Sequence, residues 1–200
     1  MKLYYFRGAC SLSPHIILKE SGLPFELVKV DTETGLAGGR KFIEINPKDY
    51  VPVLELDNGE VLTEGAVIVQ YIADLVPEKN LIPKVGTKER YRCQEWLNYI
   101  GAEIHKGFGP LFMDEIPDDF EEVMKNRLRG RIDFAETHLS KNEYLMGSQF
   151  SVADAYLFTV MSWCTFMKID TSKWPATMAY VDKIKKRPAT IAALADEKAR

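Results

Sequence analysis

The sequence predicts an α/β domain in its first half and an all-helical domain in its second. Residues 1–76 alternate between short apolar, strand-like runs and segments with helical periodicity, whereas the periodic segments that follow are helical. Between them, residues 77–86 hold two prolines, a glycine and few apolar residues, which is typical of a linker. We therefore expect domains at 1–76 and 87–200, joined by a linker at 77–86.

Composition narrows the class of protein. Of the 200 residues, 46% are hydrophobic and 28% are charged, as in ordinary globular proteins. The 26 Lys and Arg against 29 Asp and Glu give a net charge of −3, which argues against binding driven by nucleic-acid phosphates. No apolar run approaches the roughly 20 residues of a membrane helix, and a strand-like run rather than a signal peptide opens the chain. With three widely spaced cysteines (Cys10, Cys93 and Cys164), the sequence predicts a cytoplasmic protein with reduced thiols.

The first half contains a strand–helix–strand unit followed by a hairpin and a further helix. A crossover of this length between parallel strands is expected to be right-handed. Asn58-Gly59 between two apolar runs predicts a tight turn, and Thr63-Glu64-Gly65 opens a helix that ends before Pro77. The expected elements are a strand at 3–6, a helix that ends at Gly22, a strand at 25–31, a glycine-rich loop, a short helix at 40–46, strands at 53–57 and 60–62, and a helix from 63–65. This βαβ(α)ββα order predicts a thioredoxin-like fold.

The second half is predicted to be helical throughout. Apolar residues between 96 and 104 recur at helical spacing, and residues 120–139 form another helix. A capping-box pattern at 151–154 starts a helix that is apolar almost all round, so we expect it at a central, buried position. Pro175 and Pro188 mark the last two helices.

Cys10 is the strongest candidate for chemistry. It follows the first strand, with Ser11 or Ser13 expected as the N-cap and Pro14 in the first turn of the next helix. A thiol beside the exposed N–H groups at a helix start ionises more readily. Ser13 makes the motif C-x-x-S rather than C-x-x-C, so a small thiol from outside would have to resolve a mixed disulfide. The alternative is a half-buried cysteine that only packs.

Two further candidate sites lie in the first half. In a thioredoxin-like fold, a cis Val51–Pro52 bond would turn the Val51 backbone toward a peptide ligand, as in an added strand. Glu64 and Gly65 stand at a helix start, where backbone N–H groups bind carboxylates and Glu64 would hold an ammonium group. Alternatively, Glu64 simply interacts favourably with the helix dipole.

His105 and Lys106 are the candidates in the second half. As neighbours on a helix they point about 100° apart, so they do not share one face. His105 would donate to a thiolate or ligand, and Lys106 would lower a thiol pKa or anchor a carboxylate; the alternative is a surface pair. His15 and His138 are expected to be structural, and no Cys/His cluster predicts a metal site. The glycine-rich stretch 35–39 matches no nucleotide-binding fingerprint.

Taken together, these residues resemble the glutathione transferases, specifically the bacterial beta class, over the length of the chain. The motifs that carry the resemblance are Gly8-Ala9-Cys10-Ser11-Leu12-Ser13-Pro14-His15, Val51-Pro52, Leu62-Thr63-Glu64-Gly65, Glu95-Trp96-Leu97-Asn98, Glu103-Ile104-His105-Lys106 and Ser151-Val152-Ala153-Asp154-Ala155-Tyr156-Leu157-Phe158.

The resemblance implies a glutathione transferase fold, paired as a homodimer, with glutathione in the cleft between a thioredoxin-like domain and an all-helical domain. Cys10 would replace the tyrosine or serine used elsewhere in the superfamily and form a mixed disulfide with glutathione. The resemblance implies catalytic roles for Cys10, His105 and Lys106. The implied glutathione-binding residues are Cys10, Tyr50, Val51, Pro52, Glu64, Gly65, Asn98, Ala102, Glu103 and His105, some of them reaching in from the partner subunit. Ser151 and Asp154 resemble a helix cap of the family that is structural.

Two departures from the family pattern concern glutathione. Gly35 stands where members carry a lysine that binds a glutathione carboxylate, and Arg40 or Lys41 is a candidate replacement. Gly65 stands where many members have serine, which leaves a backbone donor for the γ-glutamyl carboxylate.

The expected activity is conjugation of glutathione to small hydrophobic electrophiles, in the service of detoxification and without a metal. Phe108, Phe112 or Trp163 would help to form the hydrophobic substrate site. One alternative is a glutaredoxin-like monothiol enzyme that exchanges thiols and disulfides. Another is a non-catalytic protein of the same fold that binds ligands or partner proteins.

Overall fold

The computed structural model describes residues 1–113 and 115–199, which form two compact units. Unit 1 comprises Met1–Ile82 with the C-terminal segment from Lys186, and unit 2 comprises Pro83–Lys185. Asp114 and Arg200, both inside the predicted helical domain, lie outside the described residues. The boundary between the units at 82/83 falls within the predicted linker, where Pro77–Lys79 forms a 3-10 turn.

Unit 1 is built on a six-stranded sheet in the order β4-β3-β2-β1-β5-β6. β1 pairs in parallel with β2, with Leu3 opposite Leu27, and the other pairs are antiparallel. The strands are β1 (Lys2–Tyr5), β2 (Glu26–Asp31), β3 (Leu36–Ala37), β4 (Arg40–Lys41), β5 (Val53–Glu55) and β6 (Val61–Thr63). The helices are α1 (Leu12–Ser21), α2 (Phe42–Ile45), α3 (Gly65–Asp74) and α10 (Pro188–Ala199).

The strands alternate their side chains between two faces of this sheet. Tyr4 and Val53 pack with Phe42 and Ile45 of α2 in one buried cluster. Tyr5 points the other way and contacts the ring of His15 on α1, which packs against α3. The helices therefore cover both faces, as in a thioredoxin-like fold, and that prediction is confirmed.

The glycine-rich loop differs from its prediction. It contains a small hairpin, β3–β4, whose turn residues Gly38 and Gly39 have φ values of 56° and 82°. These left-handed values favour glycine, so the same glycines that suggested a loop allow the chain to reverse. The predicted helix at 40–46 is consequently shorter and begins at Phe42.

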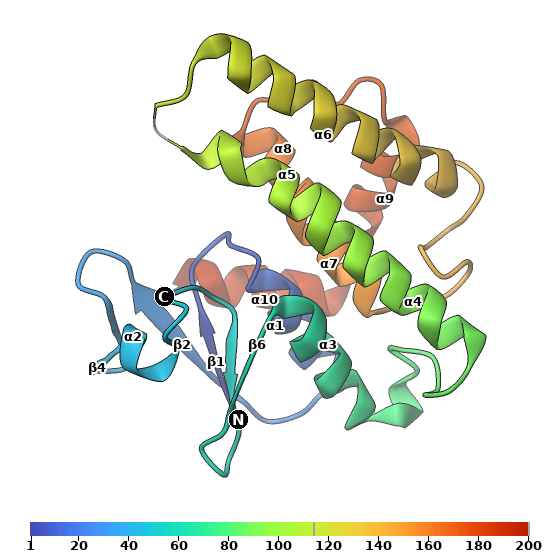
Figure 1. Cartoon of the computed structure of the whole chain (residues 1–200). Coiled ribbons are helices and arrows are strands. Elements are labelled where there is room, and N and C mark those ends of the chain that lie inside the picture. The colour runs from blue at the N-terminus through green and yellow to red at the C-terminus, as the bar shows by residue number, and fades with distance from the viewer. Residues whose placement is uncertain (114, 200) are drawn as a thin grey trace. The chain divides into compact units, whose positions relative to one another are not determined.

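The C-terminal helix α10 packs against α1 in unit 1 (Figure 1). The sequence-based division placed it in the helical domain, because periodicity identifies a helix but not the surface that covers it. The ion pairs made with α1 are long-range: Arg187 Nε, just before α10, lies 2.7 Å from Glu20 Oε1, and Asp196 Oδ2 of α10 lies 2.6 Å from Lys19 Nζ.

Unit 2 is helical in its described residues, and α7 is its most buried helix. All ten residues of α7 are buried, and it packs against α4 and α9, as its all-round apolar sequence predicts. The helical segments are α4 (Lys88–Tyr99), a π-helical turn (Ile100–His105), α5 (Lys106–Phe108), a 3-10 turn (Gly109–Phe112), α6 (Asp118–Leu139), α7 (Val152–Met161), α8 (Trp163–Phe166) and α9 (Pro175–Lys185).

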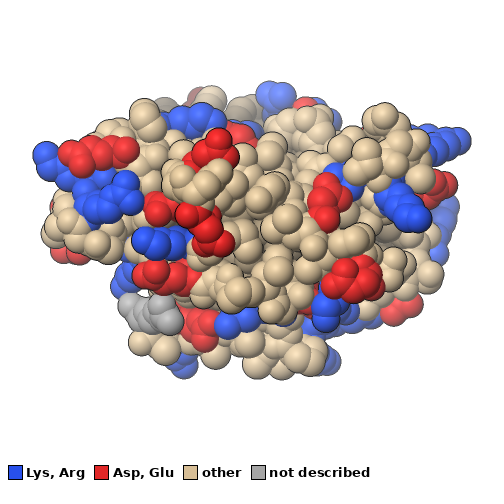
Figure 2. Space-filling model, turned by 90° about the horizontal axis from the view of Figure 1, so that it is seen from below, with Lys and Arg blue, Asp and Glu red and all other residues tan. Residues whose placement is uncertain are grey.

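The surface carries both signs of charge. Positive and negative side chains are interspersed over the face seen in Figure 2, in keeping with the small net charge. Across the residues that the structure describes, no helix combines the length and the apolar character needed to cross a membrane.

Candidate active site

Cys10 lies in the turn between β1 and α1. Gly8 has a φ of 74°, the left-handed value expected of a sharp turn at glycine. Ser11 stands at the N-cap of α1, but its hydroxyl donates to Phe6 O at 3.1 Å and accepts from Phe6 N at 3.3 Å instead of capping the helix. Ser13 Oγ is buried with no hydrogen-bond partner among the described residues. Ser11 therefore occupies the predicted N-cap position without capping the helix through its side chain, because its hydroxyl ties the turn back to Phe6.

The Cys10 thiol is half-buried and donates to the Val51 carbonyl oxygen, with Sγ and O 3.3 Å apart. The N–H groups of Leu12 and Ser13 donate to the carbonyls of Ala9 and Cys10. These two helix-start N–H groups are therefore engaged by carbonyl groups of the turn itself. In this contact the thiol is the donor and the Val51 carbonyl oxygen is the acceptor.

The other predicted residues of unit 1 lie next to Cys10. The Val51–Pro52 peptide bond is cis, as expected. A Cβ added at Gly65 would lie 3.6 Å from Pro52 Cγ, so the start of α3 packs against this proline. Cys10, Val51, Pro52 and Gly65 are therefore neighbours, although they come from three separate segments.

Glu64 is held by two groups from the loop before β5. The Tyr50 hydroxyl donates to Glu64 Oε1 at 2.6 Å, and Lys48 Nζ donates to the same oxygen at 2.7 Å. The hydrogen bond to Glu64 raises the pKa of Lys48 and the pKa of Tyr50. The sequence analysis assigned no role to Lys48. Its position two residues before Tyr50, in the loop that holds the predicted Tyr50, Val51 and Pro52, was the signal that could have identified it.

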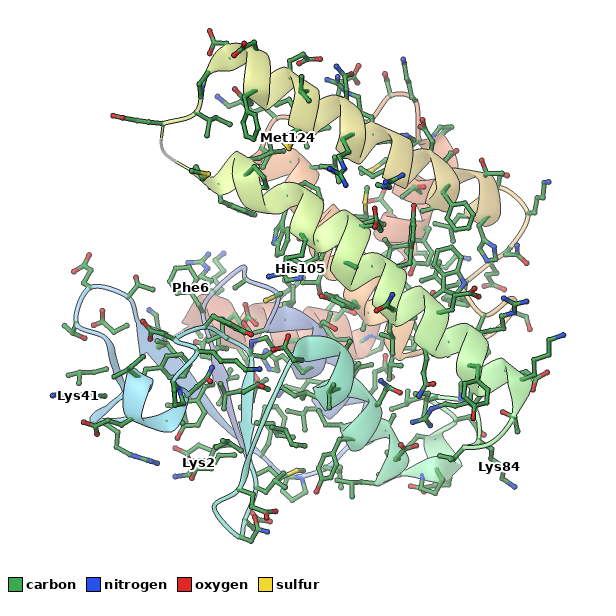
Figure 3. The ribbon with its side chains drawn as sticks, in the orientation of Figure 1. Lys2, Phe6, Lys41, Lys84, His105 and Met124 are labelled. Carbon is green, nitrogen blue, oxygen red and sulfur yellow. The ribbon has the colours of Figure 1, made fainter. Side chains whose placement is uncertain are left out.

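His105 ends the π-helical turn of unit 2. Its Nδ1 lies 2.7 Å from the Tyr156 hydroxyl, and its ring meets Trp163 edge-on with centroids 5.0 Å apart. Figure 3 labels His105 on the helical stretch that follows α4. Tyr156 belongs to α7 and is nearly buried, so the core helix of unit 2 orients this histidine. Sequence analysis assigned no role to Tyr156, since the π-helical turn that brings the two together has no simple periodicity.

The remaining predicted residues lie along the same helical stretch. Asn98, Ala102 and Lys106 are exposed and spaced four apart in sequence. Glu103 is half-buried, and its Oε2 lies 2.6 Å from Arg131 Nε on α6.

The aromatic residues expected at a hydrophobic substrate site differ in accessibility. Phe108 is fully buried and Trp163 is 7% exposed, so Phe108 offers no accessible surface to a substrate in this structure. Phe112 is 46% exposed, and its ring lies roughly parallel to that of Phe166, with centroids 6.4 Å apart. Phe108 is buried because it packs edge-on against Trp163 in the core of unit 2.

The two other histidines, His15 and His138, form hydrogen-bonding contacts within the fold. His15 is buried with Nδ1 3.2 Å from Glu197 Oε1, and His138 Nε2 lies 3.1 Å from the Leu145 carbonyl oxygen. Within the described ranges, no group of three or more His, Cys, Asp or Glu side chains is arranged to hold a metal ion.

The fold and these residues define a class of protein: a thioredoxin-like domain with a cysteine in its β1–α1 turn, followed by helices. The profile of the glutathione S-transferase N-terminal domain matches residues 8–75, and that of the C-terminal domain matches residues 100–188. The chain belongs to the glutathione S-transferase family.

Individual members of the family are similar to this chain over nearly its whole length. Glutathione S-transferase GstA of Escherichia coli O157:H7 is 41% identical over 198 residues, which is 98% of each chain. BphK, a bacterial GST solved as a ternary complex, superposes with a TM-score of 0.97 at 47% identity, covering 99% of this chain and 100% of that one. A bacterial beta class glutathione S-transferase of Sphingomonas chungbukensis gives a TM-score of 0.94 at 42% identity, over 98% of both chains. The predicted likeness to the beta class is confirmed, and the protein is a glutathione S-transferase with glutathione as cosubstrate.

Proposed function

We propose that this glutathione S-transferase conjugates glutathione to small hydrophobic electrophiles, and that Cys10 also forms a reversible mixed disulfide with glutathione. The observation that carries the proposal is the position of the Cys10 thiol, 3.3 Å from the Val51 carbonyl oxygen and beside Pro52. The Val51 backbone would pair with the glutathione main chain, as an added strand does. That pairing would bring the cysteine of glutathione close to Cys10. A sphingomonad glutathione S-transferase with a TM-score of 0.96 and 40% identity was solved with glutathione bound, which supports this site.

The remaining assignments follow the geometry of each unit. Glu64 would hold the α-ammonium of the γ-glutamyl group, and the N–H groups at the start of α3 (Gly65) would bind its carboxylate. In unit 2, His105 and Lys106 would favour the glutathione thiolate by hydrogen bonding and positive charge. The thiolate then attacks the electrophilic carbon, a C–S bond forms, and the leaving group departs with its electron pair.

A second candidate activity is thiol–disulfide exchange. The Cys10 thiolate would attack the disulfide of a glutathionylated substrate, forming the mixed disulfide and releasing the substrate thiol. A free glutathione thiolate would attack the mixed disulfide, giving glutathione disulfide and restoring Cys10. Ser13 favours this monothiol route, because Cys93 and Cys164 are buried in unit 2 and neither is near Cys10 in sequence.

From the membership in the glutathione S-transferase family we also propose that the protein is a cytoplasmic homodimer. Asn98, Ala102 and Glu103 would complete the glutathione site, some of them in the partner subunit. Sedimentation velocity checks the assembly, and a monomer at micromolar concentration would contradict it. A non-catalytic binding protein remains the contrasting role, and such a protein would show no turnover.

Intact mass measurement tests the role of Cys10. We expect the wild type to gain one glutathionyl adduct on exposure to glutathione disulfide and to lose it on reduction. Cys10→Ala should gain none, while Cys164→Ala, the matched control with a buried thiol removed, should behave as the wild type does.

Turnover of a generic aryl halide distinguishes the reactions in the same variants. We expect Cys10→Ala to abolish thiol exchange and only alter conjugation. Equal loss of both would show that one thiol serves both reactions. An adduct that persists in Cys10→Ala would contradict the mixed-disulfide proposal, and no turnover together with no retention on immobilised glutathione would indicate the binding role.

A further inference from the structure

Lys48, Tyr50 and Glu64 form a compact group, here called the charge-pair cluster, where β6 meets α3. Lys48 Nζ lies 2.7 Å from Glu64 Oε1 and 2.9 Å from Thr63 Oγ1, and the Tyr50 hydroxyl lies 2.6 Å from the same Glu64 oxygen. The cluster joins two segments, the loop before β5 and the end of β6. It therefore presents a positive and a negative group side by side at the start of a helix.

Stability does not account for this arrangement. The side chains of Lys48 and Glu64 are 48% and 52% exposed, and an ion pair this accessible to water contributes little to folding. Glu64 also has a φ of 68°, and Asp49, inside the same loop, has a φ of 54°. Left-handed backbone at residues other than glycine is uncommon and costs free energy, and it concentrates at ligand-binding sites. Among the described residues four non-glycine residues have such a φ, and two of these belong to this place: Glu64 is a member of the charge pair and Asp49 follows Lys48.

We propose that Lys48 is a carboxylate-binding residue of the glutathione site. In this assignment the α-ammonium of the γ-glutamyl group binds Glu64, its α-carboxylate binds Lys48, and the Tyr50 hydroxyl orients Glu64. The inference rests on the proposed glutathione site. It adds a positively charged side chain for the α-carboxylate, which the assignments given so far do not include. An α-amino acid carries its two charges on one carbon, so a receptor for it needs opposite charges next to each other, as Lys48 and Glu64 are.

The surroundings favour Lys48 over the other basic residues considered. Gly35 supplies no side chain where the family pattern has a lysine. Arg40 is engaged by Glu55, with Nη1 and Oε2 3.1 Å apart. Lys48 is the basic side chain whose Nζ the structure puts in contact with Glu64. Val67 N–H already donates to the Glu64 carbonyl, so the start of α3 offers the N–H groups of Gly65 and Ala66, which add to the attraction for a carboxylate beside Lys48.

Calorimetric titration with three ligands tests the assignment. The ligands are glutathione, the analogue 4-aminobutyryl-cysteinylglycine, which lacks the α-carboxylate, and γ-glutamylcysteine, which lacks the glycine. Lys48→Met should weaken glutathione and γ-glutamylcysteine binding about tenfold. It should change binding of the decarboxylated analogue by less than about twofold. In steady-state kinetics the KM for glutathione should rise while kcat is unchanged, because only binding is lost.

Two further variants sharpen the comparison. Tyr50→Phe should weaken all three ligands by a similar factor of about three, since each keeps the ammonium group that Glu64 holds. Lys2→Met is the matched control. Lys2 is 43% exposed and lies 3.7 Å from Glu55, so Lys2→Met also removes an exposed lysine that is paired with a carboxylate, and it should change none of the affinities (Figure 3).

The outcomes separate this inference from the function on which it rests. Unchanged glutathione binding in Lys48→Met would overturn the inference alone, as would an equal loss for glutathione and the decarboxylated analogue. A loss confined to ligands that carry glycine would assign Lys48 to the glycine carboxylate and also overturn it. Failure of the wild type to bind glutathione would overturn the proposed site and the inference together.

Discussion

At the residue scale, Asp154 shows how a local motif acquires long-range partners. Its buried carboxylate accepts hydrogen bonds from the Ser151 N–H at 2.7 Å, as the capping-box pattern predicts. It also accepts from the Leu145 N–H and the Tyr180 hydroxyl, both at 2.9 Å. Burial raises the pKa of Asp154, while these hydrogen bonds lower it. The carboxylate therefore connects the start of α7 to the preceding loop and to α9.

We expect Asp154→Ala to lower the free energy of unfolding by about 3–5 kcal/mol, because it leaves several buried donors without an acceptor. Ser151→Ala removes only the cap residue's hydroxyl and should cost about 1 kcal/mol. Urea denaturation of both variants measures the difference. Equal losses would show that Asp154 acts as a local cap alone.

The three thiols should differ in reactivity. Burial raises the pKa of Cys93 and of Cys164 to about 12, whereas Cys10 is half-buried in its turn. An aromatic disulfide reagent at pH 8 should therefore modify one thiol in the native wild type and none in Cys10→Ala. Fast native modification of Cys93 or Cys164 would contradict this burial.

The same two thiols make stability depend on alkaline pH. Their pKa values are higher in the folded protein than the ordinary value of 9.0, so the unfolded chain loses these protons first as pH rises. Stability should be constant with respect to these groups below pH 9 and fall between pH 9 and 12, by at most about 1.4 kcal/mol per pH unit for each thiol. Denaturation of Cys93→Ala and the wild type at pH 8 and pH 10 tests this, since the variant should lose less stability over that interval.

Tyr156 should matter to activity through His105. Tyr156→Phe removes the hydroxyl 2.7 Å from His105 Nδ1 and should lower kcat/KM for conjugation about tenfold, with a changed pH–rate profile. Tyr99→Phe is the matched control, because the Tyr99 hydroxyl donates to the Arg131 carbonyl at 2.8 Å and does not reach the histidine. If both variants lose activity equally, the effect belongs to packing in unit 2.

At the element scale, α10 supports the turn that carries Cys10. The buried Glu197 carboxylate accepts from the Gly8 N–H at 3.2 Å, and its other oxygen lies 3.2 Å from His15 Nδ1 on α1. The helix periodicity of 188–199 was visible in the sequence. The partner of Glu197 was not, because helical periodicity does not show which backbone N–H a buried carboxylate accepts from.

Glu197→Ala should lower the free energy of unfolding by about 2–4 kcal/mol, since it removes the buried carboxylate that accepts from the Gly8 N–H and contacts the buried His15 ring. Thermal or urea denaturation measures this loss. Lys198→Ala, an exposed change on the same helix, should alter stability by less than about 0.5 kcal/mol. A comparable loss in the two variants would mean that helix propensity, and not the buried contact, is responsible.

At the scale of the whole molecule, unit 1 is assembled from both ends of the chain. A fragment of residues 1–82 lacks α10, so it exposes the face of α1 that α10 covers and should unfold at a lower temperature than the intact protein. Adding a peptide of residues 186–200 in trans should raise that melting temperature, whereas the same peptide with Glu197→Ala should not. A fragment as stable as the intact protein would show that α10 is dispensable to the unit.

The order of the main elements, apart from the β3–β4 hairpin, and the position of Cys10 between the first strand and the first helix were determined by the sequence alone. Periodicity of two or 3.6, turn glycines and prolines act over a few residues, so they identify strands, helices and their junctions locally. The same local signals located Val51–Pro52 and Glu64 in their loops.

Only the tertiary structure decided which segments meet. The packing of α10 on α1, the hydrogen bond between Tyr156 and His105, and the contact of Lys48 with Glu64 each join residues of separate segments. Ser11 likewise bonds back to Phe6 rather than capping its helix, since the path of the turn sets its neighbours. Burial and hydrogen bonding depend on distances in space, and spacing along the chain constrains those distances only within an element.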